Sequence, residues 1–423
     1  MSGSRGVLLL LAAWAAAETS LAQEDRTPRA GEPYSATVFG SIVAAPAVDR
    51  RLVTDAYVSL AAIPDDLEKR RLVPAAGILV WRNRGGRHGL LRAALSGLYD
   101  DVRWEPGPEG VSSLALTFFN DTLPWDRSEY VQGVRIAGAD LERHQIRAGA
   151  GIGWRRTIRP GLQDNMIEAA LTVEPGVLLF SRGSRTDADF RVPRDVFEGR
   201  VHLRLRADSL ERNILELPHA GWAAGLDGLI GERAGWESWG GGVFGAANGS
   251  RDRRWQRVEA WGLAAFGTPG APRERQRWIA SAYVGIGSRL DRFSAFRLGG
   301  GSNAGDVESL STAIVPAAAA DELFPSRYGL VNLEYRYQAV FFLFFQLKGT
   351  LAWVEQPQFG PGGSGVFRRV RPLNGITAGL TSGFLWSSEI EVNAAYNFGL
   401  ERPKDGRPRK GGRSVFVSWI KAL

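Results

Sequence analysis

The residue types that most often carry catalysis are scarce in this chain. It has no cysteine and only four histidines in 423 residues, so a cysteine nucleophile and a cysteine-ligated zinc site are excluded. No G-x-S-x-G nucleophile elbow occurs, and Ser364 lies in a Pro/Gly-rich turn. The histidines lack metal-ligand spacing to one another; they are His88, His144, His202 and His219. We therefore expect no enzyme activity, no metal and no cofactor. The alternative is a serine, a histidine and a polar third group that only the fold brings together.

A run of three glycines is the other candidate for chemistry. Gly299, Gly300 and Gly301 stand near the start of a long connection, Ser288 to Ser326. Glycines in a phosphate-binding loop are arranged this way, but neither a Walker pattern nor a strand-turn-helix context accompanies them. The glycines instead allow a close backbone approach and positive φ. A loop this long in a compact fold is normally a lid or an inserted constriction.

Composition and charge narrow the class of protein further. The chain has 52 glycines, 14 tryptophans and 44% hydrophobic residues, which is not the composition of a disordered chain. Beyond the N-terminus no stretch reaches the roughly 18 to 20 apolar residues that a spanning helix needs. The formal charge is +7, and the arginines are spread along the whole chain. This distribution predicts no nucleic-acid partner and favours outer-membrane lipids or lipopolysaccharide as partners.

The N-terminus indicates the compartment. Residues 1–22 have the pattern of a secretory signal peptide, with Arg5 before an apolar core from Val7 to Ala17 and a small-residue cleavage site after it. The apolar core is too short to span a bilayer, which disfavours an uncleaved anchor. Residues 23–50 would then form a lead-in to the folded domain. Export without cysteines is compatible with the bacterial periplasm or outer membrane.

Apolar and polar residues alternate along most of the remaining chain. In the segment 200–208 the odd-numbered residues are apolar, and the even-numbered ones are arginine, histidine or aspartate. The same period of two recurs in 146–155, 331–339 and 389–398. A soluble β-sandwich also alternates, but its inner faces would meet in a segregated core. About sixteen such segments behind a signal peptide predict instead an all-β, transmembrane antiparallel β-barrel over residues 51–423.

The predicted strands are separated by turn residues. They are 54–63, 73–82, 90–104, 111–121, 129–138, 144–157, 165–180, 198–212, 218–232, 254–267, 275–287, 328–341, 343–354, 374–385, 388–399 and 413–422. Two more segments, Ser35–Ala45 and Glu237–Ala246, are candidates for a further strand. Because bacterial single-chain barrels take even strand numbers, we expect one of these two in a loop or plug and predict sixteen strands.

Such a barrel turns its apolar face to lipid, and the polar face, rich in arginine, glutamate, asparagine and glycine, would line a wet lumen. Tryptophans near the segment ends would form girdles at the level of the lipid headgroups. The alternative is that they are core aromatics of a soluble β protein. These tryptophans are Trp81, Trp104, Trp154, Trp222, Trp353 and Trp386.

The long connection resembles one found in the outer-membrane assembly-factor superfamily, the BamA/TamA-like bacterial surface antigen barrels. In that family the loop after the eleventh strand carries a segment like FFLGGGSVRGY and folds back into the lumen. Here Phe296 to Asp306 reads FRLGGGSNAGD and matches the first half, including Arg297. The VRGY part falls on Asn303, Ala304, Gly305 and Asp306, so that only the glycine is kept.

Three further segments match in the family's order. Ala207 to Trp222 resembles the approach to the ninth strand. The GLVNLEYRY segment resembles the twelfth strand, with its lumenal glutamate at Glu334. The thirteenth-strand pattern FxDxG is met by Phe345 and Gly349, with Leu347 in place of the acid. The matches together cover about residues 198–423, and the upstream half fits by strand pattern alone.

The departures from the family pattern concern one ion pair. In the family a loop arginine pairs in the lumen with the strand acid, a charge-assisted contact that fixes the loop. This chain has Ala304 and Leu347 at the two positions, so both partners are absent and no ion is left unpaired. We expect the loop to enter the lumen, held by its glycines and apolar residues without this lock. The alternative is a loop displaced outward from a more open lumen.

The resemblance implies an outer-membrane protein that acts in protein assembly, translocation or transport, with client polypeptides as partners. The family usually places periplasmic polypeptide-binding modules ahead of the barrel. Residues 23–50 are far fewer than a domain needs, so we expect a barrel-only member. The alternative is a porin-like or structural barrel that has lost the assembly activity.

Overall fold

The computed structural model describes fourteen stretches of the chain. They are residues 27–38, 40–63, 72–83, 89–123, 129–136, 138–159, 165–240, 252–270, 274–300, 309–319, 322–359, 366–383, 388–404 and 407–423. The predicted signal peptide lies outside them, as does Trp386. None of the described residues forms a helix long and apolar enough to cross a membrane.

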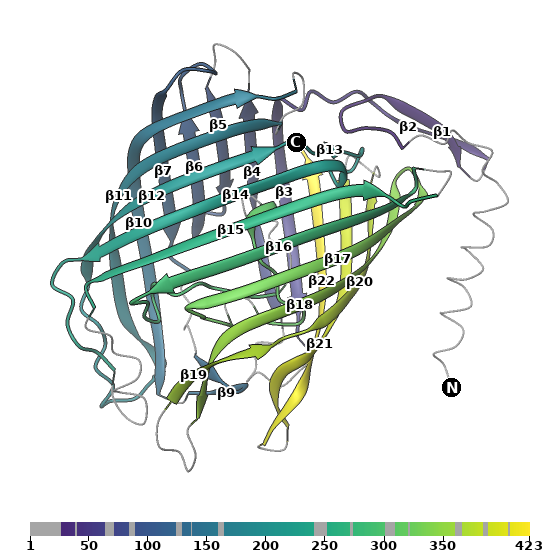
Figure 1. Cartoon of the computed structure of the whole chain (residues 1–423). Helices are drawn as coiled ribbons and strands as arrows, with labels where there is room; N and C mark the ends of the chain where they lie inside the picture. Colours follow the sequence, from purple (N-terminus) through teal and green to yellow (C-terminus); the bar gives the residue numbers. More distant parts are fainter. Residues whose placement is uncertain are drawn as a thin grey trace.

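The chain folds into a closed antiparallel β-barrel of sixteen strands (Figure 1). The wall is formed by β3 (Leu52–Ala62), β4 (Leu72–Asn83), β5 (Leu90–Leu95), β6 (Tyr99–Glu105), β7 (Ser113–Asp121), β10 (Ala139–Thr157), β11 (Met166–Thr186), β12 (Val196–Asp208), β13 (Glu211–Arg212), β14 (Pro218–Arg233), β15 (Arg254–Gly267), β16 (Gln276–Ser288), β17 (Arg327–Val340), β18 (Leu343–Phe359), β19 (Val366–Pro372), β20 (Gly375–Gly383), β21 (Ser388–Lys404) and β22 (Arg407–Ala422). The barrel closes where β22 pairs with β3, Val415–Ala422 opposite Asp55–Ala62.

Two of the sixteen wall strands are interrupted. β19 and β20 pair with consecutive parts of β18 and form one strand broken at Leu373–Asn374. β12 and β13 likewise both pair with β14 and are separated by Ser209–Leu210. With each pair counted once, the predicted number of sixteen strands is confirmed.

The predicted count was reached through two errors that cancel. The segment 90–104 is a hairpin of β5 and β6, since the chain reverses at Ser96–Leu98. Gly97 has φ of +80° there, and the Asp100 carboxylate accepts the backbone N–H of Ser96 at 2.9 Å and of Gly97 at 2.8 Å. The segment 129–138 contributes no wall strand. It forms the small hairpin β8 (Tyr130–Val131) and β9 (Val134–Arg135).

The two doubtful segments also lie outside the wall. Ser35–Ala45 forms most of a separate hairpin, β1 (Tyr34–Val38) and β2 (Ser41–Ala45), which packs on Phe341 beside the barrel. Of Glu237–Ala246, residues 237–240 belong to a loop, and the rest lies outside the described residues. A barrel with an even number of wall strands is therefore compatible with a lead-in segment before β3.

The outer surface of the barrel is apolar. Exposed side chains include Val201 (43%), Leu351 (52%) and Ile286 (64%), each from a different strand. On β12 the alternating Arg200, Arg204 and Arg206 are buried on the opposite, lumenal face. This arrangement matches a hydrocarbon exterior and a polar interior, with the backbone of the wall paired between neighbouring strands in a closed ring.

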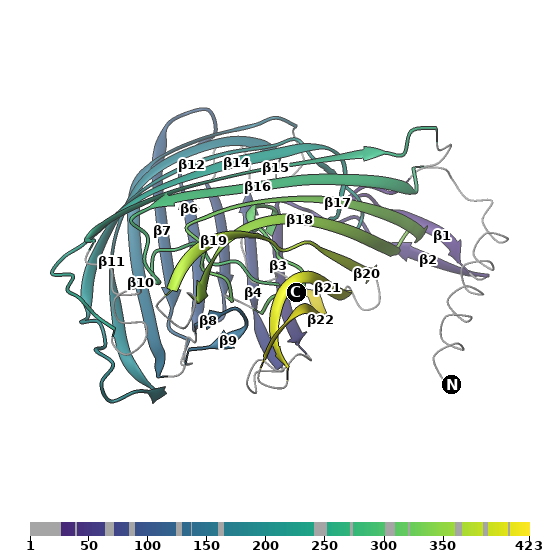
Figure 2. The same ribbon diagram turned by 60° about the horizontal axis from the view of Figure 1, so that its bottom comes forward.

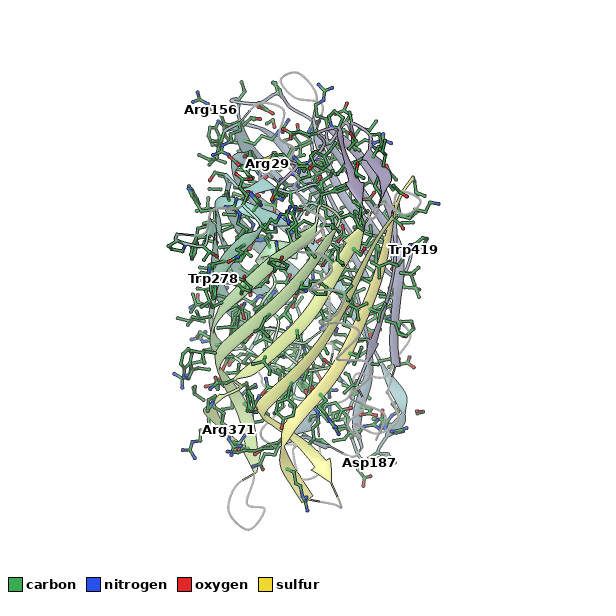
Figure 3. All side chains as sticks on the ribbon, turned by 90° about the vertical axis from the view of Figure 1, so that its right-hand side faces the viewer. Arg29, Arg156, Asp187, Trp278, Arg371 and Trp419 are labelled. Atoms are coloured by element: carbon green, nitrogen blue, oxygen red, sulfur yellow. The ribbon has the colours of Figure 1, made fainter. Side chains whose placement is uncertain are left out.

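Large aromatic side chains lie on the outer face near one end of the wall, as a headgroup-level girdle requires. Trp104 and Trp222 are 47% and 50% exposed. Trp278 and Trp419 also project outward (Figure 3). Of the tryptophans predicted for the girdle, Trp81 faces the lumen instead, where the Arg92 guanidinium lies 4.6 Å above its ring, and Trp386 is not among the described residues.

The two ends of the barrel differ in their connections. The end that holds the C-terminus has short links, such as Phe341–Phe342 between β17 and β18, whereas the other end carries the long connections 122–138, 187–195, 234–253 and 289–326 (Figure 1). Arg29 lies near the first end and Asp187 near the second (Figure 3). We refer to them as the short-loop end and the long-loop end. This asymmetry is typical of outer-membrane barrels, whose periplasmic turns are short.

Lumenal glycines make room for the large side chains inside the barrel. A Cβ on Gly176 would lie 2.5 Å from Cγ of Arg147, which is opposite it on β10. On Gly231 a Cβ would collide with the Trp255 ring, and on Gly225 it would lie 2.7 Å from Cδ of Arg206. These three glycines thus have a steric basis, since each accommodates a neighbouring arginine or aromatic side chain.

Candidate functional site

The connection between β16 and β17 folds into the barrel. Its residues Phe296, Leu298 and Val315 are at most 3% exposed. They pack on inward-facing apolar side chains of the wall, among them Ile279 and Leu330. Since β16 is the eleventh wall strand, the loop has the place that the sequence resemblance implied, and the alternative of a loop displaced outward is wrong.

The loop has a backbone ladder of its own. Leu298 exchanges N–H···O bonds with Leu323, at 2.9 and 3.0 Å. The N–H of Val315 donates to the Gly299 carbonyl at 2.9 Å, and that of Gly300 donates to the Ala318 carbonyl at 3.1 Å. A Cβ on Gly300 would lie 2.5 Å from the same Ala318 oxygen. This glycine is required because the two loop segments approach too closely for any side chain.

Three buried ion pairs connect the loop to other parts of the barrel. Asp291 accepts from Arg233 of β14 at 2.6 Å, and both side chains are nearly inaccessible. Nε of Arg292 lies 2.7 Å from Glu129, in the connection between β7 and β10. Near the loop's return, Glu322 binds Arg402 of β21, whose Nη2 also donates to the Ala317 carbonyl at 2.9 Å. We call these three pairs the loop clamps.

The clamps add to the prediction, which concerned only the loss of the family's ion pair at Ala304 and Leu347. The loop is held by apolar packing, as expected, and by charged pairs as well. None of the six clamp residues belongs to the family motif: Glu129, Arg233, Asp291, Arg292, Glu322 and Arg402. Their sequence separations are large, so the chain alone gives no spacing by which to pair them.

The other predicted site residues are partly brought together. Arg297 lies in the loop, where its guanidinium donates to the Arg292 carbonyl and stands 5.5 Å above the Phe324 ring. Glu334 faces the lumen and accepts from Arg336 at 2.5 Å, as the twelfth-strand resemblance implied. Four of the predicted loop residues lie outside the described residues, namely Gly301, Ala304, Gly305 and Asp306.

Phe345 and Gly349, predicted for the lumen, lie instead on the outer face of β18. Leu347 between them is 56% exposed, whereas the alternating Phe344 and Ala352 are buried inside. Because side chains alternate along a strand, a pattern displaced by one residue changes face entirely. Leu347 therefore does not replace a lumenal acid. The inward positions here are Gln346 and Lys348.

The opposite half of the lumen holds a water-accessible cavity of about 380 Å³. Its walls are β6, β7, β10, β11, β12, β14 and β15 on one side and the loop on the other. Eight arginines and five carboxylates line it, so its charge is predominantly positive. We call it the arginine cavity. Figure 2 views the barrel with the long-loop end forward, where the β8–β9 hairpin lies and contacts β18.

Most charged side chains of the arginine cavity are paired with each other. The His202 ring lies between two carboxylates, with Nδ1 at 3.1 Å from Glu174 and Nε2 at 2.8 Å from Asp227. Arg206 binds the second Asp227 oxygen at 2.5 Å. This network holds the acids on the wall and leaves the centre of the cavity facing guanidinium groups.

Other candidates for chemistry gain no support from the geometry. His219 lies at the short-loop end, 2.5 Å from Arg277, and His88 and Ser364 lie outside the described residues. Among the described residues no cluster of histidine and carboxylate side chains is arranged to hold a metal ion. The arginine cavity was missed as a site by the sequence reasoning, which predicted only that the lumen is polar and arginine-lined. The sequence feature that could have indicated this cavity is the arginine at alternate positions within residues 198–212.

Comparison with known proteins gives structures but no sequence relatives. No family model and no curated protein matches the chain. Among solved structures, BamA from Haemophilus ducreyi lacking POTRA domains 1–3 is 12% identical with a TM-score of 0.46, over 93% of this chain and 76% of that one. CdiB from Escherichia coli is 13% identical with a TM-score of 0.45, over 92% and 67%. The copper transporter OprC is 11% identical with a TM-score of 0.33, over 90% and 82%.

Proposed function

We propose that this chain is an integral outer-membrane β-barrel protein that transports solutes across that membrane through its lumen. The observation that carries the proposal is the contrast between the two faces of the wall. Apolar side chains cover the outside, and a cavity lined by charged side chains lies inside a closed ring of strands. A closed barrel with this distribution requires a bilayer, or a detergent in its place, around its apolar exterior.

In this mechanism the loop between β16 and β17 controls passage. It fills the half of the lumen next to β16–β18 and forms one wall of the arginine cavity. Solute would pass between the loop and the charged strands β10–β15. The loop clamps fix the width of this path, because they bind the loop to β14, to β21 and to the connection before β10.

Single-channel conductance in planar bilayers tests the proposal. The wild-type chain should give small, steady conductance steps, and Glu322→Gln, which breaks the Arg402 clamp, should give larger or fluctuating steps. Heat-modifiable gel mobility serves as the folding control for both proteins. A folded wild-type barrel that never conducts, with a folded Glu322→Gln variant equally closed, would contradict a transport function.

Protein assembly or translocation with client polypeptides is the second candidate. It is supported by the order of the motifs and by the seam of the barrel. β22 spans Arg407–Ala422, but its pairing with β3 covers only Val415–Ala422. A short seam is easier to open than the neighbouring β21–β22 pairing, which runs along nearly the whole strand. A census of outer-membrane proteins after depletion of this protein would test the role, and an unchanged census would count against it.

A further inference from the structure

We propose that the arginine cavity binds a small solute bearing a phosphate, sulfate or carboxylate group, and that Arg147 and Arg257 are its principal ligands. The proposal rests on the proposed function in one respect, namely that solute reaches the lumen. It adds the chemical class of the solute and the residues that recognise it. Both arginines line the cavity, Arg147 from β10 and Arg257 from β15.

Arg147 is buried without a hydrogen bond to any described residue. Its Nε is inaccessible on the surface of the chain and has no partner. The nearest carboxylate oxygen, on Glu174, is 3.8 Å from Nε, beyond hydrogen-bond distance. The guanidinium also stands 4.1 Å above the Phe119 ring, which leaves its N–H edge available. A guanidinium carries five N–H donors, so Arg147 has an unusually large number of hydrogen-bond donors without an acceptor.

Arg257 has no ion pair within the described part of the chain. Its Nη1 donates to the Ser294 and Ala295 carbonyls, both at a long 3.3 Å, and its Nε is buried without a partner. These two carbonyls belong to the loop, so Arg257 lies where the loop meets the charged wall. The Glu259 and Asp227 carboxylates act on Arg257 electrostatically but do not bind it. A buried cation without a hydrogen-bonded counter-ion is costly, and an anion in the cavity would reduce that cost.

A third arginine increases the positive potential at this place. Arg200 lies within electrostatic range of both Arg147 and Arg257. It is itself satisfied, since Glu198 binds it at 2.6 Å. The nearby acids do not neutralise the other two arginines, because Glu174 is 3.1 Å from His202 and Asp227 is held between His202 and Arg206. Glu174, 3.8 Å from Nε of Arg147, and Glu259, which acts electrostatically on Arg257, offset part of the charge, but neither accepts a hydrogen bond from these two arginines. The wall therefore carries two cations that face one space with hydrogen-bond donors unused.

The geometry favours an oxyanion over other ligands. Guanidinium forks match the spacing of oxygens on phosphate, sulfate and carboxylate groups, and they bind such groups in bidentate fashion. A space of about 380 Å³ accommodates a small metabolite and excludes a folded polypeptide. The cavity lies inside the closed ring of strands. Phosphate groups of bilayer lipids therefore do not reach it from the membrane, which favours a dissolved solute.

Titration calorimetry of the purified full chain in an uncharged detergent, with inorganic pyrophosphate as the probe, tests the proposal directly. Arg147→Gln and Arg257→Gln should each weaken binding about tenfold or more, the usual loss for a charge-assisted contact. Arg254→Gln is the matched control. It lies on the same strand as Arg257, but Arg254 is 71% exposed and binds Glu232 outside the cavity, so its affinity should stay within about twofold of wild type.

Three results would overturn the proposal: no pyrophosphate binding by the folded wild-type chain, equal affinities in all variants, or an equal loss in Arg254→Gln. If Arg257→Gln fails to fold because the loop contacts are lost, Arg147→Gln decides alone, since Arg147 has no hydrogen bond or ion pair with the described part of the loop. A second arm repeats the titration after reconstitution with and without phosphatidylglycerol. Competition by this lipid would refute a dissolved solute as the ligand.

Titration and conductance measurements together distinguish failure of this proposal from failure of the proposed function. Binding that depends on Arg147 in a barrel that never conducts would support the anion site and contradict transport. Conductance without selectivity for anions, measured as a reversal potential in a KCl gradient and unchanged in Arg147→Gln, would support transport and contradict the site.

Discussion

The clamp between Glu322 and Arg402 gives the sharpest test of how the loop is held. The Arg402 and Glu322 side chains are 4% and 3% exposed, and Arg402 Nη2 lies 2.9 Å from Glu322 Oε2. Glu322 also accepts the Ala319 backbone N–H at 2.7 Å. Replacing Glu322 with glutamine removes the carboxylate that faces the buried Arg402 guanidinium. Breaking a buried pair in this way costs about 3–5 kcal/mol.

This cost should appear as opening of the loop before unfolding of the wall. A loss of about 3 kcal/mol changes an equilibrium constant by more than a hundredfold. The wall strands keep their ladder bonds, so gel mobility in unboiled samples should remain that of the folded barrel. Cleavage by protease within the loop and the conductance of single channels are the two assays. Both should rise in Glu322→Gln and in Arg402→Gln.

A double-mutant cycle and a surface pair supply the controls. Glu322→Leu combined with Arg402→Met removes both charges, and it should restore most of the lost stability, because replacing both members of a buried pair is often nearly neutral. The surface pair Arg191–Glu237 has a similar N···O distance, 2.8 Å, but its side chains are 57% and 43% exposed. Arg191→Gln should therefore cost less than about 1 kcal/mol. If the clamp variants lose no more than this control, the loop is not held by its ion pairs.

Three further predictions concern other parts of the barrel. Gly300→Ala should destabilise the loop by about 1–3 kcal/mol, measured by chemical unfolding in detergent, while Gly199→Ala, where a Cβ meets nothing within 4 Å, should have little effect. Leu347→Arg should make the free energy of barrel insertion less favourable by up to about 2–4 kcal/mol, because this side chain faces lipid. The assay is the folded fraction in vesicles, and insertion equal to wild type would contradict the assigned face. At the short-loop end burial acts to raise the pKa of Glu274, but hydrogen bonds from Arg29 and the Thr27 backbone N–H, with the nearby positive charge, together outweigh it and lower the pKa below its ordinary value of 4.5. A carboxylate with a lowered pKa stabilises the fold above its unfolded pKa and loses that contribution as the pH falls through the folded value. The 27–50 segment should therefore become sensitive to protease below about pH 4, and Glu274→Gln should remove the pH dependence.

The sequence was sufficient to predict the architecture because the wall repeats one simple pattern. In β12 the alternation of Arg200, Arg204 and Arg206 with valine and leucine indicated both the strand and the face of each residue, and the structure confirms both. Strand boundaries failed where the local signal was weak. The β5–β6 hairpin reverses at Ser96–Leu98, yet apolar residues flank the turn and the segment reads as one strand.

The details of the site needed contacts that sequence spacing does not reveal. Glu129 and Arg292 are far apart in the chain, and nothing in the sequence pairs them. Leu347 was assigned to the lumen by aligning a motif, whereas the strand's own alternation places it on the outer face. In a membrane barrel the alternation is the stronger evidence. A shift of one residue would turn the apolar side chains toward the water-filled lumen and the polar side chains toward lipid.

The wall also encodes where its loop lies. β16, β17 and β18 present apolar residues on the lumenal face as well as outside, for example Ile279, Leu330 and Val354, all at most 5% exposed. Apolar side chains facing a water-filled lumen would be unfavourable, so strands of this kind require a cover inside the barrel. β10 and β12 carry arginines at the equivalent positions and need none. The distribution of inward residues around the ring therefore assigns one half of the lumen to the loop and leaves the other half to water and solute.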